Sequence, residues 1–258
     1  MTALRIPTPA EVMKKATVIS SAAEAPILGK GRHDTAVYWA ETGVGIAFQH
    51  AGCLELLRAH YGNRLLVVED VYREWLNKAD QRREPPMPWD DDQDRAAYAK
   101  WCKVVAACRH LDKPSATAVF GPYEQLDFNE EPEIRRLREE LVEMPEADQP
   151  LRADDQWTHR GECATVRAAQ LRAAAHARRH SGVPFPQVLI SNDGKALKLA
   201  QRKRLGARTS AQVLLEIVAA GEQGLDAEAA WLLHLRMDEV ARIPADRRPT
   251  GAEFFHIP

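Results

Sequence analysis

One segment constrains the fold of this 258-residue chain more than any other. Residues 187–191, of sequence QVLIS, form a short apolar run of the kind that becomes a buried strand. The turn sequence Asn192-Asp193-Gly194 follows, and residues 195–205 have the composition of a helix that Gly206 ends. A strand that passes through a tight turn into a helix is a building unit of parallel α/β sheets.

Other segments repeat this alternation. Residues 35–40 and 64–68 are rich in β-branched, aromatic and aliphatic side chains, which predicts two more strands. Helices are predicted at 46–60, 70–80, 96–111, 132–144, 162–179 and 209–220. In the helix at 70–80, Val71, Trp75 and Leu76 are expected to face the core. Strands separated by helices predict an α/β fold with a mainly parallel, doubly wound sheet, and ligands gather at the carboxyl ends of such strands.

Two stretches are expected to lack regular structure. Residues 82–94 contain three prolines and the run Asp90-Asp91-Asp92, and both features disfavour a continued helix. Residues 145–155 are a polar connection. The segment around Val119 and Phe120 gives no firm prediction.

Composition sets the broad class of protein. With 45% hydrophobic and 28% charged residues, the chain has ample material for a globular core. Its apolar stretches are short and interrupted by charges, so we expect no membrane span, no membrane partner and no secretion signal. The four cysteines show neither a CxxC pair nor the spacing of a zinc site. Reduced thiols and a cytoplasmic location are the expectation.

Charge is distributed unevenly along the chain. Residues 151–210 contain twelve Lys or Arg and four Asp or Glu, whereas residues 124–148 contain ten acids and three arginines. A basic face beside an acidic pocket would suit a polyanionic substrate such as a nucleic acid. Ordinary solvated helix faces explain the same pattern equally well.

Four acidic residues lie beside predicted junctions between strands and helices: Glu41, Glu74, Glu162 and Asp193. A fold that brought them together would create a carboxylate pocket that repels itself unless hard cations such as Mg²⁺ or Mn²⁺ neutralise it. Cations held in this way can activate water and stabilise the leaving oxygen of a phosphodiester. The four acids therefore point to a nuclease.

The segments that carry these acids resemble the PIN-domain ribonucleases, best known as toxins of bacterial type II toxin–antitoxin pairs. The resemblance covers about residues 35–80 and 157–218. Its motifs, in chain order, are Glu41-Thr42, Ala51 to Leu57, Val71 to Glu74, Arg160-Gly161-Glu162 and Val188 to Gly194.

The resemblance implies a three-layer α/β/α domain at about residues 33–220, with a helical insertion at about 82–155. Residues 1–32 and 221–258 would be an N-terminal extension and a C-terminal helical extension. It also implies Mg²⁺- or Mn²⁺-dependent cleavage of RNA that leaves a 5′-phosphate and a 3′-hydroxyl, in a toxin or defence effector. An antitoxin or another protein partner and homo-oligomerisation are further implications.

The chain departs from the family pattern at two positions. Glu41 replaces the usual Asp, and Asn192 stands where many members have a second Asp. Asp34-Thr35 offers a competing Asp-Thr match, but it precedes the strand. Two alternatives therefore stay open: a catalytically degenerate module that binds nucleic acid or a protein, and a DNA-cleaving effector in a larger assembly.

The expected roles differ among the four acids. Glu41 and Asp193 would bind a divalent cation directly, Glu162 would bridge or support a second position, and Glu74 would orient water or complete the outer shell. Three of them also have a structural interpretation: Glu74 as an exposed acid on a helix surface, Glu162 as an acid in the first turn of a helix, and Asp193 as a turn residue. Supporting groups are expected from Thr42, Ser191 and Asn192.

Four basic residues are candidate contacts to substrate phosphates: Arg160, Lys195, Lys198 and Arg202. Lys195 and Lys198 lie three residues apart in a predicted helix, so they can share one face. Solvated helix charges are the alternative. His176 and His180 have the spacing of a helical metal pair, but they lack the intervening Glu of HExxH, so a surface pair is expected.

Overall fold

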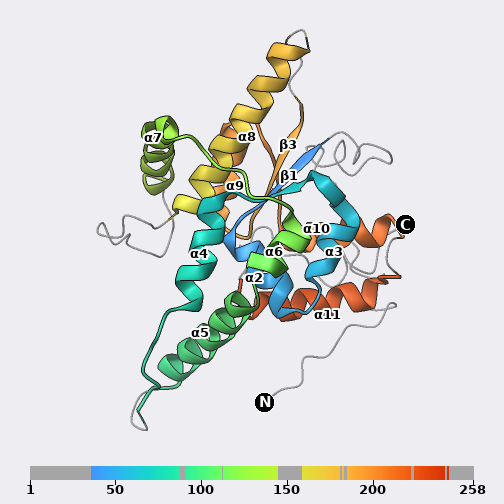
Figure 1. The fold of residues 1–258 in the computed structure, drawn as a ribbon. Coiled ribbons are helices and arrows are strands. Elements are labelled where there is room, and N and C mark those ends of the chain that lie inside the picture. The colour runs from blue at the N-terminus through green and yellow to red at the C-terminus, as the bar shows by residue number, and fades with distance from the viewer. Residues whose placement is uncertain are drawn as a thin grey trace.

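A four-stranded parallel sheet lies at the centre of the protein (Figure 1). The structure is a computed structural model that describes residues 36–87, 91–111, 113–144, 159–180, 182, 185–221, 224–241 and 243. Its strands are β1 Val37–Ala40, β2 Leu65–Leu66, β3 Gln187–Ile190 and β4 Gly206–Arg208, in the order β2-β1-β3-β4. The three predicted strands are confirmed, although each is shorter than expected. β4 was not predicted from the sequence.

Every strand pair is parallel, so the carboxyl ends of the strands meet at one edge of the sheet. Ala40 of β1 pairs with Ile190 of β3, and Ile190 pairs with Arg208 of β4. Just beyond this edge, the Glu41 amide donates to the Ile190 carbonyl over 3.2 Å. The residues that follow β1 and β3 are thereby neighbours.

The helices connect and cover these strands. They are α2 Thr42–His50, α3 Leu54–Tyr61, α4 Glu69–Ala79, α5 Asp92–His110, α6 Lys113–Phe120, α7 Glu131–Val142, α8 Arg160–Arg179, α9 Gly194–Arg202, α10 Ser210–Ala219 and α11 Ala227–Asp238. α7, α8 and α9 pack on one another, α2, α10 and α11 form a second group, and α4 contacts both α2 and α8. This arrangement is compatible with a three-layer α/β/α fold. α8 and α5 project at opposite ends of the molecule (Figure 1).

The core joins the sheet to both groups of helices. Trp39 of β1 and Trp75 of α4 are among the largest fully buried side chains, and the Trp75 indole Nε1 donates to the Thr42 carbonyl over 2.9 Å. Val71 and Trp75 are buried as expected, but the expectation for Leu76 was wrong, because it is 38% exposed. A residue that follows Trp75 directly on a helix turns about 100° away from the face that Trp75 buries.

Several predicted boundaries are wrong. The single helix predicted at 46–60 is two helices, α2 and α3, broken at a turn where Gly52 has φ 73°. α5 begins inside the predicted loop at 82–94, because Asp91 caps it by accepting from the Asp94 amide over 2.8 Å. Carboxylates favour a helix start, where free N–H groups and the helix dipole attract them. Gly206 does not end α9, since the helix stops at Arg202 and Gly206 begins β4.

The remaining helix predictions hold within a few residues, and α11 lies within segment 221–258, for which a helical extension was expected. Ala230 and Met237 bury one face of α11 against the common core. The polar connection expected at 145–155 and the extension at 1–32 lie outside the described residues. Among the helices that the structure describes, none has the length and apolar character needed to span a membrane.

Candidate metal centre

The four predicted acids converge beside the carboxyl edge of the sheet. Glu41 follows β1 directly, and Asp193 follows β3 as the cap of α9. Glu162 lies in the first turn of α8, and Glu74 lies on α4. Glu162 acts electrostatically on both Glu41 and Glu74, and Asp193 acts on Glu41. Carboxylates that lie far apart in the sequence thus form one cluster.

Glu41 is the most buried member, at 3% exposed. Its Oε2 accepts from the Gly43 amide over 2.8 Å, which caps α2, and its Oε1 accepts from the Asn192 amide over 3.4 Å. Burial and the charge of Glu162 raise the pKa of Glu41 to about 8, and the hydrogen bond from Gly43 opposes the shift. A side chain at Gly43 would press on this carboxyl, because a Cβ there would lie 2.8 Å from Glu41 Oε1.

Glu74 is held by donors from two other helices. Its Oε2 accepts from the Thr42 hydroxyl at the start of α2, and its Oε1 accepts from the Gly161 amide of α8 over 2.8 Å. Burial and the charge of Glu162 raise the pKa of Glu74 to about 7. A Cβ at Gly161 would lie 2.7 Å from Glu74 Oε1, so the glycine makes room for this carboxyl.

Glu162 has the least satisfied carboxyl of the cluster. Its Oε2 is buried and has no hydrogen-bond partner in the structure. Its Oε1 lies 3.7 Å from Nδ1 of His159, whose pKa is raised mainly by interaction with Glu162. His159, Glu162 and Asp193 each offer one ligand atom, and these atoms all lie within 4.8 Å of one another.

His159 was missed by sequence reasoning. It precedes α8 with a left-handed backbone, at φ 63°, which aims its side chain at the first turn. The signal was its spacing of three residues from Glu162, but the predicted helix began only at residue 162.

Two of the three expected supporting residues, Ser191 and Asn192, stabilise the turn after β3. The Ser191 hydroxyl accepts from the Asp193 amide over 2.9 Å, and Asp193 Oδ1 accepts from the Ala196 amide over 2.8 Å. Asn192 Oδ1 accepts from both the amide and the hydroxyl of Ser210, over 3.0 and 2.8 Å. The Asn192 side chain therefore ties this turn to α10, and its carbonyl oxygen is already occupied.

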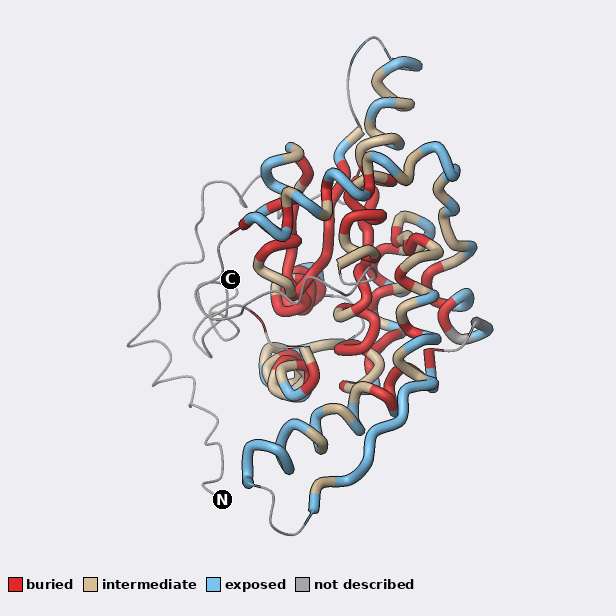
Figure 2. The backbone as a smooth tube through the Cα atoms, turned by 90° about the vertical axis from the view of Figure 1, so that its left-hand side faces the viewer, coloured by how far each residue is buried: buried red, intermediate tan, exposed pale blue. Residues whose placement is uncertain are grey.

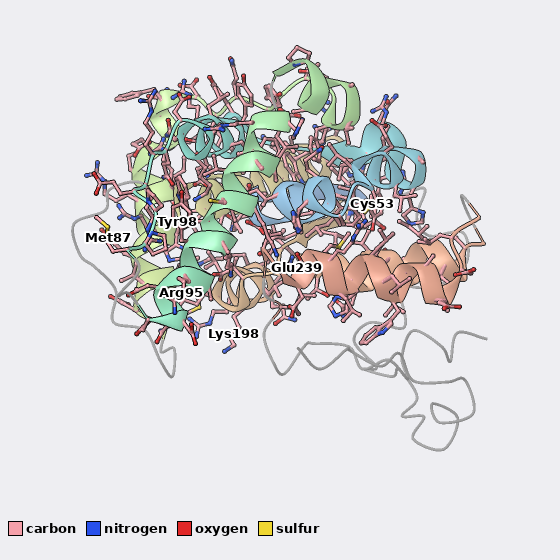
Figure 3. All side chains as sticks on the ribbon, turned by 90° about the horizontal axis from the view of Figure 1, so that it is seen from below. Cys53, Met87, Arg95, Tyr98, Lys198 and Glu239 are labelled. Atoms are coloured by element: carbon pink, nitrogen blue, oxygen red, sulfur yellow. The ribbon has the colours of Figure 1, made fainter. Side chains whose placement is uncertain are left out.

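The basic candidates occupy different settings. Arg160 forms a bidentate pair with Glu131, at 2.7 and 2.8 Å, and its Nε donates to Asp70 over 2.6 Å. Lys195 is buried, whereas Lys198 and Arg202 are exposed on α9. Figure 3 shows Lys198 at the outer surface of the molecule. Contact with phosphate remains a prediction for all four residues, and Arg160 has its guanidinium engaged by protein carboxylates.

The donor set fits a hard divalent cation. Several carboxylates crowd together, burial and their mutual repulsion raise two of their pKa values, and a buried Glu162 oxygen has no hydrogen-bond donor. Oxygen ligands of this kind suit Mg²⁺ and Mn²⁺, and an imidazole nitrogen is more readily accepted by Mn²⁺ than by Mg²⁺.

Fold and site together define a class: a parallel α/β protein with a carboxylate cluster at the carboxyl edge of its sheet. Comparison with protein-family models, with curated proteins and with solved structures finds no match to this chain. The site geometry therefore carries the functional argument.

Proposed function

We propose that this chain is a PIN-like endoribonuclease that depends on Mg²⁺ or Mn²⁺. The observation that carries the proposal is the convergence of Glu41, Glu74, Glu162 and Asp193, with one Glu162 oxygen buried and unpartnered. Supporting it are the order of the four motifs along the chain and the parallel sheet that places two of the acids at one edge.

Each residue of the cluster has a role set by its position. The cation would be held by Glu162, Asp193 and His159, and Glu41 would add its charge from a neighbouring position. A divalent cation held there would supply the Lewis acidity and charge neutralisation that phosphodiester hydrolysis requires. The Thr42 hydroxyl and the Gly161 amide fix the Glu74 carboxyl beside the cluster.

The identity of the substrate and the biological role extend this proposal. RNA is the preferred substrate, and a role as toxin or defence effector, with an antitoxin or another protein partner, follows from the resemblance to PIN domains. The exposed Lys198 and Arg202 of α9 support a polyanionic substrate.

Cleavage of RNA by the purified protein tests the proposal. Labelled RNA and single-stranded DNA would be incubated with wild type in Mg²⁺, Mn²⁺ or EDTA, beside Glu162→Gln and Asp193→Asn. We expect metal-dependent RNA cleavage that falls at least about 100-fold in both variants. Glu55→Gln, which changes an exposed acid of α3, is the matched control and should cleave like wild type. Equal rates of RNA cleavage in wild type and all three variants would contradict the proposal.

A second candidate is a catalytically degenerate module that binds nucleic acid without cutting it. Two observations favour it: backbone N–H groups engage both oxygens of Glu41, and Ser210 occupies the Asn192 carbonyl oxygen. Tight RNA binding without cleavage in any metal would select this candidate. Cleavage of DNA alone would indicate a DNA-cutting effector.

Expression in bacteria tests the role as a toxin. Growth arrest with wild type and normal growth with Glu162→Gln, at equal protein levels, is the expected result. Equal growth with both proteins would argue against a toxin acting through this site.

A further inference from the structure

A line of shallow hollows follows α4 away from the carboxylate cluster. The first hollow includes Glu74 and reaches Leu76. The second shares Leu76 with the first and extends to Arg82 and Arg109. The third shares Arg82 and Arg109 with the second and lies between segment 81–83 and α5. Neighbouring hollows thus adjoin one another at shared lining residues.

The third hollow, here called the outer groove, combines cations with aromatic rings. Its volume is about 560 Å³, and Arg82, Arg83, Arg109, Tyr98 and Trp101 contribute to its lining. The rings of Tyr98 and Trp101 lie 5.6 Å apart at an interplanar angle of 30°. Among the described residues that line this groove there is no Asp or Glu.

Within the described residues, its arginines differ from those near the cluster in having no carboxylate partner. Arg73 pairs with Glu69, and Arg160 is held by two acids. Across the part of the chain that the structure describes, no ion pair engages Arg82 or Arg83. The Nε of Arg109 donates to the Ala79 carbonyl over 3.3 Å, which leaves its terminal nitrogens available.

The groove is open to solvent. Figure 2 shows exposed backbone along segment 81–87 and along the first half of α5. Tyr98 and Met87 lie on the same side of α5 in Figure 3. Tyr98 and Trp101 are half-buried, so each ring keeps part of its surface accessible.

We infer that the outer groove binds single-stranded nucleic acid, with bases on Tyr98 and Trp101 and phosphates on Arg82, Arg83 and Arg109. Unpaired guanidinium groups attract phosphates, and exposed aromatic rings stack on bases that a single strand leaves free. A duplex keeps its bases stacked inside and cannot use these rings in the same way.

The inference rests on the proposed function only for the direction of the strand, which would run along α4 from the outer groove to the cluster. Binding in the groove is independent of the acids. An acidic protein segment is the competing occupant, but it would leave the aromatic pair without a base to stack on.

Binding in EDTA separates the inference from catalysis. Fluorescence anisotropy would measure the Kd of labelled single-stranded RNA and single-stranded DNA oligonucleotides, with a matching duplex for comparison. Wild type should bind both single strands more tightly than the duplex, and the control variant Glu55→Gln should bind like wild type. This result supports the groove even if the protein cleaves nothing.

Two variants address the two halves of the groove. The double variant Arg82→Ser/Arg83→Ser should raise Kd at least about tenfold and reduce the slope of log Kd against log salt by about 1.4, at about 0.7 for each lost phosphate contact. Tyr98→Ala/Trp101→Ala should raise Kd at least about 30-fold with the slope unchanged, because stacking carries no charge. Circular dichroism would confirm that both variants fold.

Matched controls remove the same groups elsewhere. Arg178→Ser/Arg179→Ser deletes two exposed arginines at the far end of α8, and Phe128→Ala deletes an aromatic ring that is 87% exposed. Both should bind like wild type. Wild-type Kd and salt slope in the two groove variants would overturn the inference, and so would an equal loss in the α8 double variant.

Discussion

At the residue scale, glycines decide where the carboxylates lie. Gly43 and Gly161 each donate a backbone N–H to one acid of the cluster, and each would clash with that acid if it carried a Cβ. Gly161, in the motif Arg160-Gly161-Glu162, thus positions the carboxyl of Glu74 on α4 and not only the adjacent Glu162.

Gly161→Ala tests this dependence without removing a carboxylate. The added Cβ should displace the Glu74 carboxyl, so RNA cleavage should fall about 100-fold. The free energy of unfolding should change by less than about 1 kcal/mol, because the displaced atoms end a flexible side chain and alanine is the better helix former. In a Glu74→Gln background the same change should cost little further activity, and additive losses would contradict the coupling.

The cysteines offer a second residue-scale prediction. All four are free, Cys102 is exposed, and burial raises the pKa of Cys53 and of Cys108 to about 12. Burial also raises the pKa of Cys163. A thiol reagent at pH 8 should therefore modify one thiol quickly in the folded protein and four in denaturant. Fast reaction that survives Cys102→Ser would contradict this pattern.

At the element scale, the contacts of α2 with α4 position the site. Its first residue, Thr42, holds Glu74 through its hydroxyl and Trp75 through its carbonyl, so one residue anchors two positions of α4. One turn further, Gly45 lies directly against the Trp75 indole. The close approach of α2 and α4 brings Glu74 to the cluster.

Gly45→Ala should force these two helices apart. A Cβ at this position would lie 2.3 Å from Cζ2 of the fully buried Trp75 indole, which cannot swing into solvent. Overpacking of this kind should lower the free energy of unfolding by about 1–3 kcal/mol, measured by urea denaturation. Trp75→Phe should recover part of the loss in the double variant. A variant as stable as wild type would show that the Trp75 indole can move away from residue 45 at little cost in free energy.

Element boundaries show where local sequence reasoning succeeds. Thr209 forms a capping box with Gln212, and α10 begins where the cap predicts. β4 has no such signal: Gly-Ala-Arg has low β-propensity, and the segment is a strand because β3 offers it a pairing edge. The buried Arg208 of β4 then reaches Glu216 of α10 over 2.6 Å, a contact between neighbouring elements that secures this edge.

At the scale of the whole molecule, the cluster costs stability when no cation is bound. Folding buries Glu41 and Glu74 near Glu162 and raises their pKa values from the ordinary 4.5 to about 8 and about 7. A carboxyl whose pKa is raised by folding contributes stability below pH 4.5, and that contribution is lost as pH rises through the folded value.

In EDTA, the free energy of unfolding should therefore fall as pH rises from about 5 to about 8.5, because the folded protein keeps protons that the unfolded chain has already released. Mn²⁺ should restore more stability at pH 8 than at pH 5.5, because protons compete for the same oxygens. Urea denaturation across this range, with and without Mn²⁺, measures both effects. The double variant Glu41→Gln/Glu74→Gln should flatten the profile in EDTA, and an unchanged slope would contradict the assignment.

The sequence alone determined the alternation of strands and helices, and with it the parallel sheet that places Glu41 and Asp193 at one edge. Periodicity and turn chemistry act over a few residues, so they can be recognised along the chain. The tertiary structure decided which side chains lie against each other: Glu74 contacts Gly161, and the arginines of segment 81–83 lie beside the rings of α5. These contacts depend on how helices distant in sequence pack together, and local sequence patterns do not specify that packing.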